Sequence, residues 1–163
     1  MRVHIGTDHA GFELKNRLVA VLQQKGHEVT DHGAHEYDAV DDYPPFCTDV
    51  GQAVVADPAS LGVVIGGSGN GEQIAANKVE GVRAALVGNE DTARLARQHN
   101  DANVISVGAR QHSEDELEAL IDLFLAEPFT GEERHQRRID LVGLYERTGG
   151  YTESAASTAT STD

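Results

Sequence analysis

The residues with the clearest chemical potential lie in a glycine-rich turn, residues 66–71 with the sequence GGSGNG, which runs into Glu72. Glycines let a backbone approach a ligand closely and point several N–H groups at one spot beside a helix N-terminus. Together with the Ser68 hydroxyl, such amides would form an oxyanion site. Glu72 would lie in the first turn of the following helix, where it could act as a base. A base beside an oxyanion site is what proton abstraction next to a carbonyl requires.

Two effects on the pKa of the Glu72 carboxyl group oppose each other. The helix dipole and nearby amide donors favour its ionised form, whereas burial would make it more basic. A simpler interpretation, in which Glu72 only begins a helix, fits the residues equally well.

The same turn partly matches the dinucleotide fingerprint G-x-G-x-x-G. With Gly67 as the first glycine, the third falls on Glu72, whose carboxylate would repel a pyrophosphate. No Lys-Ser or Lys-Thr pair closes the turn as in a Walker A loop. We therefore disfavour a nucleotide site.

The distribution of charge points to a small anion as ligand. The net charge is −14, with 13 Lys and Arg against 27 Asp and Glu, so we expect no general affinity for nucleic acid or anionic lipid. Three of the few basic residues nevertheless lie within five positions, in the segment RHQRR at 134–138. Such a cluster can be a solvated helix face. Against this acidic background it favours anion binding.

Short β-rich runs alternate with longer amphipathic ones and must position these residues. Strands are expected at 2–6, 27–31, 61–65, 82–87 and 103–107. Helices are expected at 12–25, 45–56, after the turn to about 77, 91–99, 113–125 and about 132–147. The pattern predicts a single Rossmann-like three-layer α/β domain, residues 1–147, with a five-stranded parallel sheet and a C-terminal helix. Residues 148–163, rich in Ser, Thr, Ala and Gly, are predicted to be a disordered tail.

In such sheets, ligands bind beyond the carboxyl ends of the strands. Several reactive residues follow strands there: Asp8, His9, Tyr43, the turn at 66–72 and Arg110. His99 and Asn100 do not fit, because they end the fourth helix and lead into the fifth strand at the opposite edge. A symmetric dimer could bring them to a partner's site, so we expect a site between subunits.

Two features bear on compartment and metal. Cys47 is the single cysteine and cannot form an internal disulfide, which indicates a reducing compartment. No segment is apolar enough to span a membrane and MRVHIG does not begin a secretory signal, so we expect a cytoplasmic protein. Asp8 and His9 suggest metal ligands, but no third ligand stands at characteristic spacing, so no metal is expected.

Six segments together resemble ribose-5-phosphate isomerase B. They are GTDHAGFELK at 6–15, DYP at 42–44, GGSGNG at 66–71, AANK at 75–78, RQHN at 97–100 and RHQRR at 134–138. The resemblance runs from residue 1 to about 147, in order and without a large gap. The wider group includes isomerases of galactose 6-phosphate and allose 6-phosphate.

The resemblance implies an aldose–ketose isomerase of the pentose phosphate pathway that interconverts ribose 5-phosphate and ribulose 5-phosphate without a cofactor. Glu72 would move a proton between C2 and C1 through an enediolate. One branch of the family uses a cysteine just after the third strand, which is Gly66 here, so the chain resembles the glutamate branch. His99 would be the acid that opens the furanose ring, with Asn100 beside it.

The remaining roles also follow from the resemblance. Enediolate stabilisation would come from Ser68 and from the amides of the turn, which include Gly67, Gly69, Asn70 and Gly71. Asp8 would contact sugar hydroxyls and Tyr43 would line the pocket. The phosphate would be bound by His9, Arg110, Arg134 and Arg138; the last two are four residues apart, on one helix face. A homodimer or homotetramer with shared sites is implied.

Three alternatives stay open. The substrate could be another sugar phosphate: erythrulose 4-phosphate, allose 6-phosphate or galactose 6-phosphate. The chain could be a non-catalytic module that binds a nucleotide or sugar phosphate on the same fold. It could also be a metal-dependent phosphatase, which a chelator would inactivate.

Overall fold

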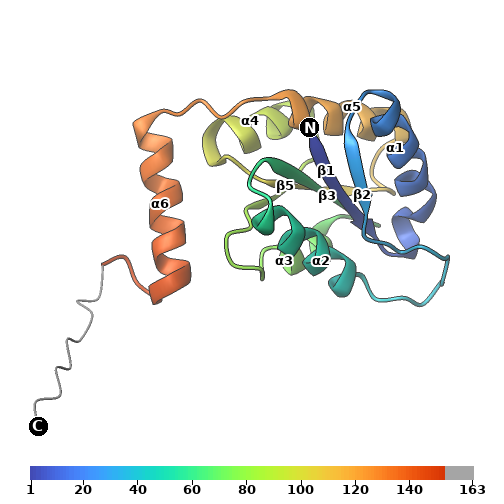
Figure 1. Cartoon of the computed structure of the whole chain (residues 1–163), viewed down its shortest axis with the longest axis horizontal. Coiled ribbons are helices and arrows are strands. Elements are labelled where there is room, and N and C mark those ends of the chain that lie inside the picture. The colour runs from blue at the N-terminus through green and yellow to red at the C-terminus, as the bar shows by residue number, and fades with distance from the viewer. Residues whose placement is uncertain (153–163) are drawn as a thin grey trace, which may run out of the picture.

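The computed structural model describes residues 1–152 and is built around five parallel strands (Figure 1). Their spatial order is β2-β1-β3-β5-β4. The strands are β1 (Arg2–Thr7), β2 (Glu28–Asp31), β3 (Ser60–Gly66), β4 (Ala84–Leu86) and β5 (Val104–Gly108). Every pair of neighbouring strands is parallel, as the alternation of strands and helices predicted.

Helices cover both faces of the sheet (Figure 1). They are α1 (Phe12–Gln24), α2 (Tyr43–Ala56), α3 (Asn70–Ala76), α4 (Glu90–Asn100), α5 (Glu114–Ala126) and α6 (Glu133–Thr148), with a short 3-10 turn at His9–Gly11. The predicted elements are all present, with shifted ends: β4 is shorter than the predicted 82–87. No helix within residues 1–152 has the length and apolar character to cross a bilayer.

The sheet separates two apolar cores. The larger lies under α1, α4 and α5, and the smaller lies under α2 and α3. Strand β3 is buried at every position, as expected for a central strand covered on both faces. Cys47 is fully buried in the smaller core.

The order of the strands creates a crevice between β1 and β3. From β1 the chain moves outward to β2, then returns across the sheet to β3 on the other side of β1. Helices that leave β1 and β3 therefore lie on opposite faces, and the loops part at the carboxyl ends of these strands. Asp8 follows β1, the glycine-rich turn follows β3, and Arg110 follows β5, so three polar segments meet at this edge.

Helix α6 stands apart from the sheet, at the end of the molecule opposite α1 (Figure 1). Its exposed side chains include the apolar Leu141, Val142 and Tyr145. Glu146, near its C-terminal end, accepts a hydrogen bond from the Gly81 amide at 2.9 Å, which ties α6 back to the domain. The helix runs to Thr148, one residue past the predicted domain boundary, and most of the predicted tail, 153–163, lies outside the described residues.

Candidate active site

A hollow of about 470 Å³ opens at the carboxyl edge of β1, β3 and β5. It is lined by eight of the predicted site residues, together with Ala10 and Gln111: Asp8, His9, Tyr43, Gly67, Ser68, Gly71, Glu72 and Arg110. A pocket of this size suits a small phosphorylated sugar. These eight residues thus lie together beyond the carboxyl ends of the parallel strands, where ligands bind in such sheets.

Glu72 is 5% exposed and lies in the first turn of α3. Burial raises the pKa of its carboxyl group, and the neighbouring Asp8 charge raises it further. The backbone N–H groups of Glu72 itself and of Gly69 act in the opposite direction. Of the two opposed effects expected from the sequence, burial is the larger. A raised pKa makes the carboxylate a stronger base than an exposed glutamate once it is ionised.

Gly66, the last residue of β3, makes room for this carboxyl group. A Cβ atom built on Gly66 would overlap Cδ and both carboxyl oxygens of Glu72. The two positions therefore compete for one space, so a side chain at 66 and a carboxylate from 72 cannot both reach it. The glycine at position 66 is therefore what leaves this space open to the Glu72 carboxyl group.

The glycine-rich turn is held by the end of β5 and its following loop. The Ser106 hydroxyl donates to the Gly69 carbonyl at 2.7 Å, and the Ala109 amide donates to the Gly66 carbonyl at 2.7 Å. Gly69 has a φ of 82°, in the left-handed region that favours glycine. These contacts fix the turn in one shape, so its donors need little reorganisation during a reaction.

Ser68 keeps its hydroxyl hydrogen free for a ligand. Its Oγ accepts hydrogen bonds from the Asn70 amide at 3.3 Å and from Asn70 Nδ2 at 3.2 Å. Two of the predicted oxyanion donors are therefore already engaged, since the Asn70 amide donates to Ser68 and the Gly69 amide faces Glu72. The candidate donors reduce to the Ser68 hydroxyl and the amides of Gly67, Ser68 and Gly71.

Asp8, Tyr43 and Arg110 also line the hollow. Asp8 is buried, and its Oδ1 accepts from the Ala10 amide at 2.9 Å, which fixes the turn after β1. Tyr43 begins α2 instead of lying in a loop, and its ring packs against Gly71, where a Cβ would lie 2.6 Å from Cζ. The Arg110 guanidinium lies beside Gly67.

Asp41 is a site residue that sequence reasoning missed. Its Oδ1 accepts from the His9 amide at 2.9 Å and lies 2.7 Å from His9 Nδ1. Possible ligand atoms of Asp8, His9 and Asp41 lie within 4.8 Å of one another, so the third group that the sequence did not supply is present. The distances from Asp41 to His9 are those of hydrogen bonds, which account for this arrangement. Reaction without a metal stays a prediction.

Four predicted site residues lie elsewhere in the chain. His99 and Asn100 end α4, and Arg134 and Arg138 begin α6. Asn100 and Arg138 line a separate groove of about 480 Å³ beside β4 and α6. Arg134 pairs with Glu132 at 2.8 Å. One chain therefore does not bring these four residues to Glu72. For His99 and Asn100 this agrees with the prediction, made from the sequence, that they lie at the opposite edge of the sheet.

His135 joins this second group. It is 3% exposed and stacks on His99, with ring centroids 4.1 Å apart and planes 14° from parallel. Burial lowers the pKa of His135, and the neighbouring His99 lowers it further. The sequence placed His135 in the basic cluster, yet gave it no role distinct from that of the arginines.

The fold and this pocket together define a class of protein. A carboxylate made basic by burial shares the hollow with donors suited to an oxyanion and with the Arg110 guanidinium. Such a set, on a Rossmann-like α/β domain, suits proton transfer next to the carbonyl of an anionic substrate, which is the chemistry of an aldose–ketose isomerase.

The chain belongs to the Ribose/Galactose Isomerase family, whose model matches residues 3–142. Ribose-5-phosphate isomerase B of Mycolicibacterium paratuberculosis is 56% identical over 148 residues, which cover 91% of this chain and 93% of that protein. The Escherichia coli protein of the same name is 36% identical over 146 residues, 90% of this chain and 97% of that one.

Solved structures agree with this assignment. Ribose-5-phosphate isomerase B from Mycoplasma genitalium, with bound ribulose 5-phosphate, superposes with a TM-score of 0.87 at 43% identity. The match covers 90% of this chain and 97% of that one. The Clostridium thermocellum enzyme has a TM-score of 0.87 at 39% identity, over 92% of this chain and all of that one. The family resemblance stated from the six sequence segments is thus confirmed.

Proposed function

We propose that the protein interconverts D-ribose 5-phosphate and D-ribulose 5-phosphate, a reaction of the pentose phosphate pathway, with Glu72 as the base. The observation that carries the proposal is the buried Glu72 carboxyl group beside the glycine-rich turn, in the space that Gly66 leaves open. The substrate follows from relatives named for this reaction and from the ribulose 5-phosphate bound to the Mycoplasma genitalium protein.

The chemistry proceeds through an enediolate. Glu72 removes the proton from C2 of the open-chain aldose, and the electron pair of that bond forms a C1–C2 double bond as negative charge moves to O1. Ser68 and the free amides of the turn stabilise that oxyanion. The C2 hydroxyl proton passes to O1 beside Asp8, and Glu72 returns its proton to C1. The product carries a ketone at C2 and a CH₂OH group at C1, so no atom is gained or lost.

Ring opening and phosphate binding draw on residues from a second copy of the chain. His99, the proposed acid for ring opening, belongs with Asn100, Arg134 and Arg138 to the group that one chain keeps away from Glu72. In a homodimer, or in a tetramer built from dimers, the partner would supply this group. The exposed apolar side chains of α6 support such an assembly, because they need a cover.

Within the hollow, the phosphate would meet Arg110 and His9 from the chain that supplies Glu72. Tyr43, packed against Gly71, would line the pocket next to the sugar. The cytoplasm is the proposed compartment, on the basis of the single buried cysteine.

Turnover assays with a panel of sugar phosphates test this function. We expect ribose 5-phosphate to yield ribulose 5-phosphate at the same rate with and without EDTA. We also expect a kcat/KM at least tenfold above those for allose 6-phosphate, galactose 6-phosphate and erythrulose 4-phosphate, since a missing or extra carbon misplaces the phosphate. A better six-carbon or four-carbon substrate would reassign the enzyme within its family. Binding of ribose 5-phosphate without turnover would support the non-catalytic alternative, and loss of activity with EDTA would require a metal.

A further inference from the structure

The contact between Asp41 and His9 spans two segments that lie 32 residues apart in the chain. His9 follows β1, whereas Asp41 ends a segment, 32–42, that joins β2 to α2 without a helix or strand. The Asp41 side chain is 12% exposed. A buried carboxylate in an irregular segment must gain its hydrogen bonds from a neighbouring element, and here it takes two from one residue.

Both hydrogen bonds serve the placement of the imidazole ring. The Asp41 Oδ1 atom holds the backbone of His9 through its amide, at 2.9 Å, and the ring through Nδ1, at 2.7 Å. An imidazole has two nitrogens, so with Nδ1 donating to Asp41 only Nε2 is left for a ligand, and Nε2 carries a hydrogen to donate when the ring is protonated. A carboxylate on Nδ1 also fixes which nitrogen is turned away from the ligand.

We propose that Asp41 is a positioning residue for His9, which it holds oriented and protonated so that Nε2–H donates to the substrate phosphate. This inference rests on the proposed function, because it takes the phosphate of a sugar phosphate as the ligand of His9. It gives the irregular segment 32–42 a part in phosphate affinity that is exerted through His9. Asp41 itself need not touch the substrate.

The charges around His9 agree with this role. The hydrogen bond from Asp41 raises the pKa of His9, and the charges of Asp8 and Asp41 add to the rise. Partial burial and the Arg110 charge oppose it. Other carboxylates that share a hollow with His9 are Glu72 on one side, and Glu13 and Glu114 on the other. The only cation lining either hollow, among the described residues, is Arg110, so His9 is well placed to be the second positive group.

The test compares Asp41→Asn with wild type in the full-length enzyme. Asparagine keeps the size of the side chain and one oxygen acceptor, but it removes the charge that keeps the ring protonated. At a pH between the two pKa values that NMR gives for the His9 ring in wild type and in the variant, we expect KM for ribose 5-phosphate to rise about tenfold, the usual scale for a hydrogen bond to a charged group, with kcat within twofold. At pH 6, where an ordinary histidine is mostly protonated, the difference in KM should shrink to about twofold.

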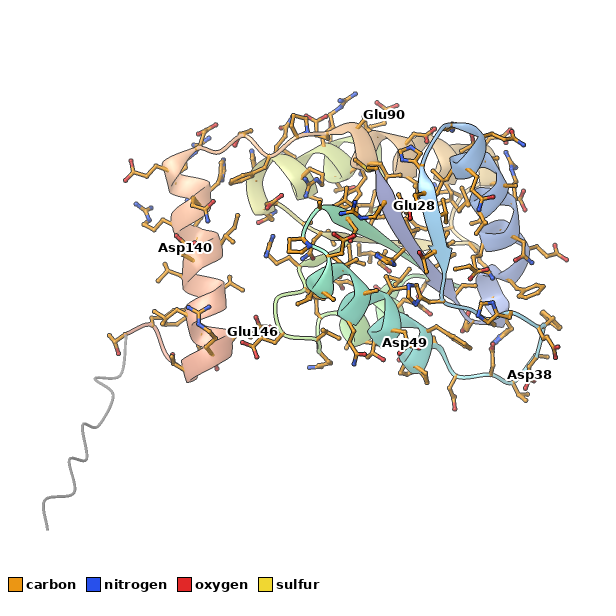
Figure 2. The ribbon with its side chains drawn as sticks, viewed as in Figure 1. Glu28, Asp38, Asp49, Glu90, Asp140 and Glu146 are labelled. Atoms are coloured by element: carbon orange, nitrogen blue, oxygen red, sulfur yellow. The ribbon has the colours of Figure 1, made fainter. Side chains whose placement is uncertain are left out.

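Two further measurements separate positioning from a structural role. In a His9→Gln background, adding Asp41→Asn should change KM less than twofold, because Asp41 acts through His9. The His9 ring should titrate by NMR at a higher pH in wild type than in Asp41→Asn. The matched control is Asp38→Asn, an exposed aspartate of the same segment (Figure 2), which should leave all values unchanged.

The outcomes are distinct from those that test the proposed function. The inference is overturned if Asp41→Asn leaves KM unchanged at a pH between the two measured pKa values of His9, or if its effect is as large at pH 6. An equal effect in the His9→Gln background would also overturn it. Each of these results leaves ribose 5-phosphate turnover by wild type intact, whereas failure of the proposed function would abolish turnover in every variant.

Discussion

Replacing Glu72 with glutamine should lower kcat for ribose 5-phosphate isomerisation by about 10³-fold, with KM within threefold of wild type. Glutamine keeps the volume and polarity of the side chain but cannot take a proton from carbon. A positioned general base contributes about 10²–10⁴-fold, and Glu72 is a carboxylate beside the glycine-rich turn whose pKa is raised by burial. Steady-state kinetics at pH 8, with and without EDTA, measure the effect.

Gly66→Ala should also lower kcat, because it displaces the Glu72 carboxyl group. A methyl group at position 66 would overlap the Glu72 carboxyl group, which must then swing away from the substrate. We expect kcat to fall at least about 10²-fold while the glutamate itself stays in the chain. For Glu72→Gln, the matched control is Glu28→Gln. Glu28 is an exposed carboxylate at the start of β2, at the end of the sheet opposite the hollow (Figure 2), so this variant should retain full activity. An active Glu72→Gln enzyme would exclude Glu72 as the base.

Two inactive variants should restore activity when they share one dimer. Glu72→Gln and His99→Asn, co-expressed with different tags and purified as the mixed dimer, would form one site without either group and one intact site. We therefore expect about half of wild-type kcat per dimer, against a background at least about 10²-fold lower for each parent. The measured quantity is the increase in kcat from either single-variant dimer to the mixed dimer.

The geometry behind this expectation is the distance between the two groups of site residues within one chain. Figure 2 places Asp38, in the segment that carries Asp41, and Asp140, on α6, at opposite ends of the molecule. If instead each chain built a complete site of its own, both subunits of the mixed dimer would lack one group. Activity no higher than that of the parents would then contradict the shared site.

Much of the architecture could be predicted from the sequence because its signals are local. The apolar run of β3 and the alternation of strands with helices predicted the parallel sheet. Because ligands bind beyond the carboxyl ends of such strands, Asp8, the glycine-rich turn and Arg110 were then expected to lie together. Even the exclusion of His99 from this edge followed from its place at the end of a helix. The same local rules could not set the ends of β4 or the start of α2 at Tyr43.

The contacts that the sequence did not reveal depend on how distant segments meet. Asp41 lies in a segment without periodicity, so nothing in the sequence indicated that its carboxylate would reach His9. The stacking of His135 on His99 depends on the angle at which α6 meets α4. Competition between Gly66 and Glu72 for one space is likewise a property of the folded turn, which brings together residues six positions apart.

Hydrogen exchange during turnover tests the central claim, proton transfer through an enediolate by Glu72, most directly. Wild-type enzyme with EDTA would convert ribose 5-phosphate in D₂O while NMR follows deuterium at C1 of ribulose 5-phosphate. Because the hollow is open to solvent, the proton held by Glu72 should exchange in part, and deuterium should appear at C1 in wild type and fall with kcat in Glu72→Gln. Product formed without deuterium at C1, as a direct hydride shift would give, or exchange at the wild-type rate in Glu72→Gln, would contradict the account.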